Sequence, residues 1–236
     1  MTVTSLANVR SAEQKLASIQ ELRQQVHRMQ GTATSQPLPT LPALSGLVQL
    51  RTGASYAVST PGLAMLAMAG PSAAGSWSAV IGMPDFGLEA AAELGVDLDR
   101  TVLVPEPGEA WLEVTAALAD VLGVVVLRVP TARSGFRPVS QHQAARLAPR
   151  IRQHDAVLIS VGDWPRAEAR LSIRDSQWTG IGRGHGRLTG RRARVIAELA
   201  TGQVREAHLL LPGDDHQVRV VDTPDRTPEL YAVRAG

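Results

Sequence analysis

The sequence has no cysteine, which excludes a disulfide scaffold, a thiol nucleophile and a metal site with cysteine ligands. Aromatic residues make up only 3% of the chain, so the core must be built from Ala, Val and Leu, and each of the four tryptophans is a candidate anchor. Lysine occurs once, at Lys15, and every other basic residue is arginine. This excludes mechanisms that need an active-site lysine in the folded body.

Long apolar runs are also missing. No stretch approaches the ~18 to 20 apolar residues of a membrane span, and the polar N-terminus does not have the pattern of a secretory signal. We therefore expect a cytoplasmic protein. The net charge is +2, from 24 basic and 22 acidic residues, which does not by itself indicate a nucleic-acid binder. A hydrophobic content of 44% in 236 residues is enough for one sizeable core.

The stretch from residue 75 to residue 130 organises the chain. Its short Val/Ile/Leu runs do not alternate with polar residues, and helical segments separate them, which predicts strands covered on both faces in an α/β fold with a parallel sheet. The apolar residues of the longer helix follow Trp111 at helical spacing. The predicted strands are 78–81, 101–104 and 123–129, and the predicted helices are 86–94 and 108–122.

Further elements are predicted on both sides of this stretch. Alternation after residue 168 indicates antiparallel strands that extend the sheet. Pro149 is expected to kink or shorten its helix. The predicted strands are 47–50, 55–59, 155–161, 169–174, 187–199, 206–211 and 217–221, the predicted helices are 63–68 and 141–152, and turns are expected at 70–75 and 180–186.

The sequence predicts four regions. Residues 1–31 form an N-terminal amphipathic helix, 32–45 a Pro/Thr/Ser linker, 46–221 the core and 222–236 a flexible C-terminal tail. The apolar stripe of the helix includes four candidate partner contacts: Leu16, Ile19, Leu22 and Val26. Either this stripe packs on its own domain or it docks on another chain.

A phosphate-binding loop is the first chemistry to look for in such a fold. Gly70 and Gly75 have the required spacing, but Ser76 and Trp77 stand where a lysine and a hydroxyl residue would be needed. The turn with the right topology, Ser59, Thr60, Pro61 and Gly62, is too short to wrap a triphosphate, and its proline lacks an N–H. We expect no bound nucleotide cofactor.

Other catalytic groups are equally scarce. The strand that ends at Ile81 is followed by no carboxylate until Asp85, which we expect to cap a helix, and Asp163 stands alone after another strand. The six histidines show no metal-binding spacing. We expect no catalytic residue and no metal, and therefore no enzyme.

Two groups of side chains favour binding. Arg133 and Arg137 flank Phe136 on the loop after a central strand, which suits single-stranded DNA. The second group lies around the predicted hairpin: Arg183, Arg187, Arg191, Arg192 and Arg194. Solvated surface arginines are the alternative for both groups. Trp164 and Trp178 are either core or edge anchors, or contact residues.

Several strings resemble the RecA core. Residues 94–99 follow a short helix, and residues 107–109 open a helix that leads to an apolar strand, in the manner of the segment before the RecA Walker B strand. The resemblance covers residues 45–212 and implies a RecA-like core with a degenerate Walker A position. More narrowly, residues 162–165 and 182–186 resemble the ImuA-type proteins of actinobacteria, which lack a phosphate loop.

That resemblance implies a non-catalytic accessory factor of damage-induced mutagenesis and translesion synthesis. The implied partners are an ImuB-type inactive Y-family polymerase homologue and an error-prone DnaE-type polymerase, with single-stranded DNA and self-association through the N-terminal helix as further expectations. Localisation would be cytoplasmic, at the nucleoid when DNA is damaged. Two alternatives stay open: a SulA-like inhibitor of the division protein FtsZ, and a residual DNA-stimulated ATPase.

Overall fold

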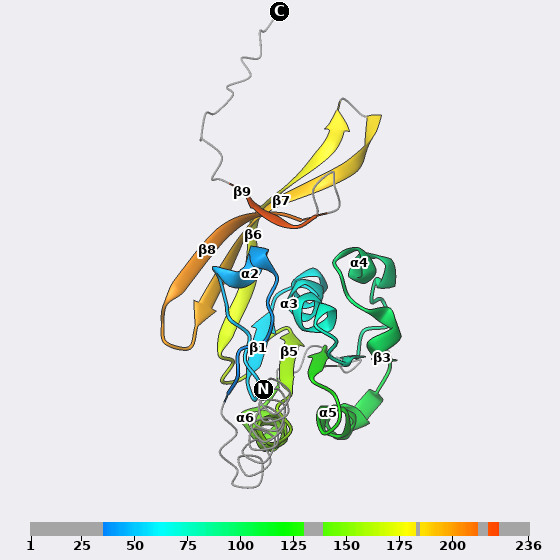
Figure 1. Cartoon of the computed structure of the whole chain (residues 1–236), viewed down its shortest axis with the longest axis vertical. Coiled ribbons are helices and arrows are strands. Elements are labelled where there is room, and N and C mark those ends of the chain that lie inside the picture. Colours follow the sequence, from blue (N-terminus) through cyan, green and yellow to red (C-terminus); the bar gives the residue numbers. More distant parts are fainter. Residues whose placement is uncertain (1–34, 130–138, 183–184, 212–216, 222–236) are drawn as a thin grey trace, which may run out of the picture.

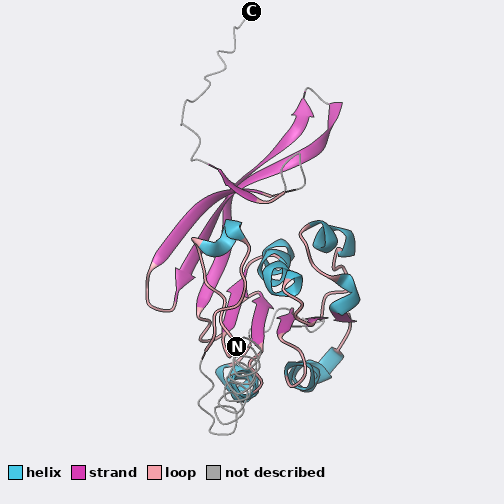
Figure 2. Cartoon of the chain, viewed as in Figure 1, coloured by secondary structure: helices cyan, strands magenta, loops and turns pink. Residues whose placement is uncertain are grey.

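The computed structural model describes residues 35–129, 139–182, 185–211 and 217–221 (Figure 1). The predicted N-terminal helix and C-terminal tail lie outside these residues. The described chain forms helices on both faces of one nine-stranded sheet, and the last strands extend away from the helices (Figure 2).

The sheet has the order β3-β2-β4-β5-β1-β6-β7-β8-β9. Strands β1 to β6 are parallel to one another, and β7, β8 and β9 continue the sheet in antiparallel pairing. The bounds are β1 Ser55–Val58, β2 Ser78–Ile81, β3 Thr101–Val104, β4 Val124–Leu127, β5 Val157–Val161, β6 Ala169–Gly182, β7 His185–Leu199, β8 Val204–Leu210 and β9 Arg219–Val221. The predicted fold class, α/β with a mostly parallel sheet extended by antiparallel strands, is confirmed.

The helices cover the two faces of the parallel part. Their bounds are α2 Pro42–Ser45, α3 Pro61–Ala73, α4 Leu88–Glu93, α5 Trp111–Ala119 and α6 Gln141–Gln153, with short 3-10 turns η1 Leu98–Arg100 and η2 Gly108–Ala110. Helices α2, α3 and α4 pack on one face, and α5 and α6 pack on the other.

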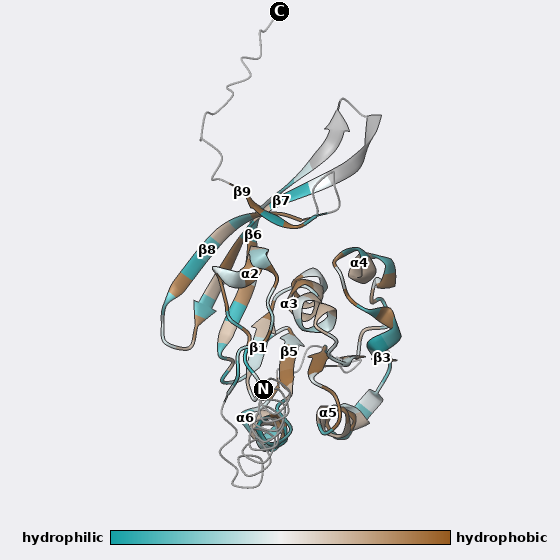
Figure 3. Ribbon diagram, viewed as in Figure 1, coloured by the Kyte–Doolittle hydropathy of each residue, from teal (hydrophilic) through white to brown (hydrophobic). Residues whose placement is uncertain are grey.

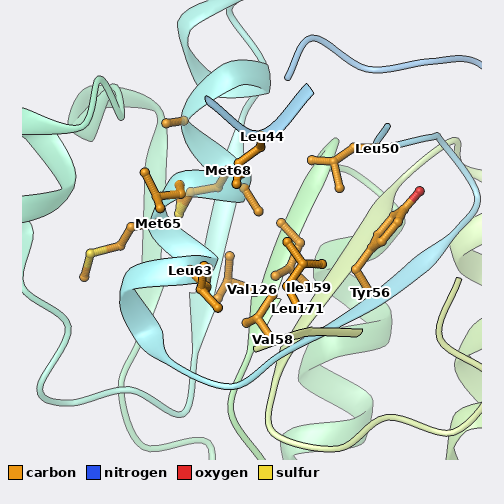
Figure 4. Close-up of a cluster of buried hydrophobic side chains, with 14 of the residues drawn as sticks. Leu44, Leu50, Tyr56, Val58, Leu63, Met65, Met68, Val126, Ile159 and Leu171 are labelled. Atoms are coloured by element: carbon orange, nitrogen blue, oxygen red, sulfur yellow. The ribbon is translucent and has the colours of Figure 1, made fainter. Parts of the chain in front are cut away.

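The central strands are buried on both sides. Val124 and Val126 of β4 belong to the core beneath α3, whereas Val125 and Leu127 belong to the core beneath α5 and α6. Figure 4 shows the first of these cores. Because alternate residues of a strand point to opposite faces, a strand covered on both sides must be apolar throughout. Figure 3 shows apolar colour on the central strands and both hydrophilic and hydrophobic patches along β8.

The segment before β1 differs from the prediction. Residues 47–50 do not form a strand: a single bridge joins Pro37 to Arg51, and the Leu38 N–H donates to the Leu50 carbonyl at 2.8 Å. Residues 35–45, expected to belong to the linker, include helix α2, whose Leu44 is fully buried. This apolar segment is buried by packing over α3 rather than by joining the sheet.

Helix α3 is longer than predicted, and α6 has nearly its predicted bounds. Helix α3 continues through Gly70 and Pro71, where a connecting loop was expected, because a proline near a C-terminus removes only one helical hydrogen bond. Helix α6 likewise runs through Pro149 without ending, and a capping box starts it, in which Ser140 and Gln143 exchange hydrogen bonds.

The antiparallel strands β6 and β7 are also longer than predicted. The expected glycine-rich turn at 180–186 is largely strand, because pairing continues to Gly182 opposite His185. Residues 183–184 lie outside the described chain. Cross-strand hydrogen bonds therefore outweigh the low strand propensity of glycine here.

Candidate functional site

The carboxyl ends of the parallel strands meet around a cavity of about 600 Å³. Ligands of open α/β sheets bind at this edge, so nucleotide chemistry in this fold would be expected here. Its walls come from residues at or just after the ends of β1, β2, β3, β4 and β5, among them Ser59, Gly82, Pro84, Glu106, Arg128, Ser160 and Asp163.

The turn between β1 and α3 is held by hydrogen bonds to β6 and by a helix cap. The Ser59 N–H donates to the Leu171 carbonyl at 2.9 Å, and Ser59 Oγ accepts from the Ile173 N–H at 3.3 Å. Thr60 Oγ1 caps the helix by accepting from the Leu63 N–H at 3.3 Å, and Pro61 has no N–H to offer. A phosphate cradle needs several free backbone N–H groups in a loop, and here the Ser59 N–H is engaged by β6 and the Leu63 N–H by Thr60.

Asp85 is not the helix cap that the sequence predicted. Helix α4 begins one residue after Gly87, and the Asp85 carboxylate instead forms an ion pair with Arg128, at the end of β4. Arg128 Nε also donates to the Gly82 carbonyl at 3.1 Å. The hydrogen bond from Arg128 lowers the pKa of Asp85. Residues far apart in sequence meet here because β2 and β4 are neighbours, which local capping rules could not anticipate.

Asp163, after β5, is paired as well. Its Oδ1 lies 3.2 Å from Nη1 of Arg170, whose Nη2 donates to the Trp164 carbonyl at 2.7 Å. The Trp164 side chain is only 2% exposed and packs in the core beside α6. Of the two interpretations of Trp164, the core anchor is correct. Asp85 and Asp163 therefore both hold arginines at the sheet edge.

A second cavity, of about 700 Å³, lies at the amino end of β1. Ala144, Ile151 and Trp164 supply apolar wall, and Arg51 and Arg152 supply charge. Arg51 donates to the Ser35 carbonyl at 2.6 Å. No local pattern in the sequence indicates this cavity, because its walls come from segments that only the fold brings together.

Only some of the predicted binding residues lie in the described part of the chain. Arg133, Phe136, Arg137, Arg183 and the four partner candidates Leu16, Ile19, Leu22 and Val26 lie outside the described residues. Arg187, Arg191 and Arg192 lie on β7. Arg191 is opposite Trp178 of β6, and Trp178 is 57% exposed, so this tryptophan is not a core anchor.

Within the described ranges, no cluster of three or more His, Cys, Asp or Glu side chains is placed to hold a metal ion. No helix in that part of the chain has the length and apolar character needed to cross a bilayer.

Comparison with known proteins places the parallel half of the sheet in a family. The family described as MT3502 N-terminal domain matches residues 42–166, more than half of the chain. Uncharacterized protein Rv3395c of Mycobacterium tuberculosis is 37% identical over 132 residues, which are 55% of this chain and 62% of that protein. The chain thus matches less than two thirds of this relative's length. On the family match, the chain belongs to the MT3502 N-terminal domain family.

Proposed function

We propose that this protein is a non-catalytic, RecA-like accessory factor of damage-induced mutagenesis, of the ImuA type. Its role is that of an adaptor between an ImuB-type inactive Y-family polymerase homologue and an error-prone DnaE-type polymerase during translesion synthesis. The amphipathic helix that the sequence predicts at residues 1–31 serves as a docking element.

One observation carries the non-catalytic part of this proposal. The turn from β1 into α3 has the topological position of a phosphate loop, yet Thr60 and Pro61 close it. Around it, Asp85 and Asp163 are engaged by Arg128 and Arg170. Phosphoryl transfer requires a cradle of N–H groups, a cation that reaches the phosphates and acidic groups that hold magnesium. The described residues at this sheet edge supply few of these three kinds of group.

The arrangement of the strands supports the RecA-like part. Strand β1 lies between β5 and β6, the first six strands run parallel, and β7 is antiparallel to its neighbours. The family match spans residues 42–166 and so includes β1 to β5 and the β1–α3 turn. A scaffold retained without its nucleotide site is suited to presenting surfaces to partner proteins.

The partner assignment is tested with purified proteins. The full chain is immobilised and offered an ImuB-type polymerase homologue, a DnaE-type polymerase and FtsZ in parallel. We expect capture of the ImuB-type protein and no capture of FtsZ. Capture of FtsZ alone would replace the proposal with a division inhibitor.

The nucleotide assignment is tested separately by equilibrium binding of a fluorescent ATP analogue with and without single-stranded DNA. We expect no saturable binding. Tight binding that Gly62→Trp abolishes would establish a nucleotide site at the β1–α3 turn and refute the adaptor model.

A further inference from the structure

Strands β6 and β7 continue past the rest of the sheet as a two-stranded ribbon (Figure 1). β8 pairs with β7 only from Arg192 onward, whereas β6 pairs with β7 as far as Gly182 and His185. The sequence from residue 176 to residue 192 contains four arginines and neither Asp nor Glu, whereas Arg194, farther along β7, is paired with Asp175 and Glu206. A protrusion with charge of one sign attracts a polyanion.

Trp178 lies on this ribbon near the point where β8 ends. It is 57% exposed, and the guanidinium carbon of Arg191 lies 5.3 Å from its ring centroid, within the range of a cation–π contact. Arg191 Nε also donates to Ser176 Oγ at 2.7 Å. These contacts fix the guanidinium beside the ring, so the two side chains form a prearranged platform with one aromatic surface and one charge.

A β-bulge decides which side of the ribbon carries this platform. One extra residue lies between Arg174 and Gln177, where Asp175 has a φ of 48°. Beyond the bulge, Trp178 and Arg191 share the side of Ala193, while the adjacent Arg192 points to the opposite face with Gln177. Two consecutive arginines are therefore divided between the two faces.

We infer that this ribbon binds single-stranded nucleic acid, with an unstacked base on the Trp178 ring and Arg191 beside the phosphate of that nucleotide. Aromatic rings that stack bases and arginines that follow the backbone are the means by which single strands are bound without sequence preference. In a duplex each base is paired and stacked between its neighbours, so no base is free to stack on the Trp178 ring. A strongly cationic ribbon with one aromatic ring fits this ligand better than it fits an apolar protein surface.

The inference adds a ligand to the proposed function, but binding by the ribbon requires no polymerase partner. The test uses the full chain and a labelled oligothymidylate of about 20 nucleotides, which exceeds the ~4 to 16 nucleotides that single binding modules cover. Fluorescence anisotropy gives the dissociation constant, and an oligonucleotide duplex of the same length is measured beside it. We expect weaker binding of the duplex at the same salt concentration.

Trp178→Ala is compared with Trp77→Ala, since Trp77 is also half exposed but lies before β2, far from the ribbon in the sheet. Loss of one stacked base should weaken single-strand binding about 5- to 150-fold in Trp178→Ala. Trp77→Ala should bind as the unaltered chain does, and Trp178→Phe should retain most of the affinity. Equal affinities of the Trp178→Ala and Trp77→Ala proteins would overturn the inference.

The salt dependence separates the two faces. For a single strand, each phosphate that the protein no longer neutralises makes the slope of log K against log salt shallower by about 0.7. We expect this decrease in Arg191→Ala and a smaller one in Arg192→Ala, whose side chain points to the other face. Equal decreases would show that the general charge of the ribbon binds DNA, and would overturn the platform model.

Two further outcomes distinguish this inference from the proposed function. If Trp178→Ala loses capture of the ImuB-type protein and keeps its DNA affinity, the ribbon is a protein docking site and the inference is wrong. If the ImuB-type protein is never captured while Trp178-dependent DNA binding persists, the inference stands and the adaptor proposal fails.

Discussion

Two glycines of helix α3 have opposite surroundings, and this predicts opposite effects for the same substitution. A Cβ added at Gly62 would meet nothing within 4 Å, whereas one added at Gly70 would lie 2.6 Å from the Pro39 carbonyl oxygen and 3.0 Å from the Leu41 nitrogen. The first of these distances is well inside van der Waals separation, and both neighbours are backbone atoms that cannot rotate away. Gly70→Ala should therefore push the segment before β1 off the helix.

The magnitudes follow from these distances. Replacing Gly62 by Ala restricts the unfolded chain at no steric cost, which should stabilise the fold by about 0.4 to 1 kcal/mol. Gly70→Ala gains about 1 kcal/mol of helix propensity but loses about 3 kcal/mol to overpacking, the upper part of the usual range because backbone must move. The net effect is a loss of about 2 kcal/mol, or a Tm lower by roughly 4 to 8 °C for a domain of this size.

Urea unfolding and thermal melting followed by far-ultraviolet circular dichroism measure both variants against the unaltered chain. Leu44 and Leu50, which are buried with the same segment, would be exposed together if it detaches, and increased binding of a hydrophobic dye to Gly70→Ala would report this. Equal stability of the Gly62→Ala and Gly70→Ala proteins would refute the packing of residues 37–41 on α3.

Three other predictions concern single side chains. Trp164→Ala removes a side chain that is 2% exposed and should cost about 3 to 5 kcal/mol in urea unfolding, while Trp77→Ala should change stability by less than about 0.5 kcal/mol; similar losses would contradict the core assignment. Burial raises the pKa of Tyr56 to about 12. The contribution of Tyr56 to stability is therefore complete below about pH 10, where the unfolded side chain is still neutral, and is lost as the pH rises through 12. Tyr56→Phe should flatten this loss of stability at alkaline pH, and an unchanged slope of stability against pH would contradict the raised pKa. Arg128→Ala should raise the pKa of Asp85, measured by NMR titration, because the carboxylate loses its partner. The stability that this ion pair contributes is present above the pKa of the unfolded carboxyl and disappears as the pH falls through the lowered pKa of the folded one. An unchanged pKa of Asp85 in Arg128→Ala would rule the ion pair out in solution.

Local pattern was enough to predict the parallel half of the fold. The strands predicted at 78–81 and 101–104 are β2 and β3 with the same bounds, because continuous Val and Ile runs bounded by turn residues have few other ways to be buried. The long helix after Trp111 is present as well, although its first turn is a 3-10 turn. The loop expected from Gly70 was predicted wrongly, and Pro149 does not shorten α6, whose bounds are within one residue of the predicted 141–152, since packing outweighs the local preference of a single residue.

Contacts between distant segments could not be predicted in this way. Nothing near Asp85 in the sequence indicates that Arg128 is its partner, because their meeting depends on β2 and β4 being neighbours. The same holds for Trp178, whose position beside Arg191 depends on a bulge and on the pairing register of β6 with β7.

The sequence by itself determined which side chains this chain has to work with: its only lysine is Lys15, and it has no cysteine. Folding cannot supply a side chain that the sequence does not contain. Only the tertiary structure decided which arginines are paired with carboxylates at the sheet edge and which lie beside an exposed tryptophan on the ribbon. The physical reason is that ion pairs and stacked side chains depend on strand order and register, which join residues that are far apart in the chain.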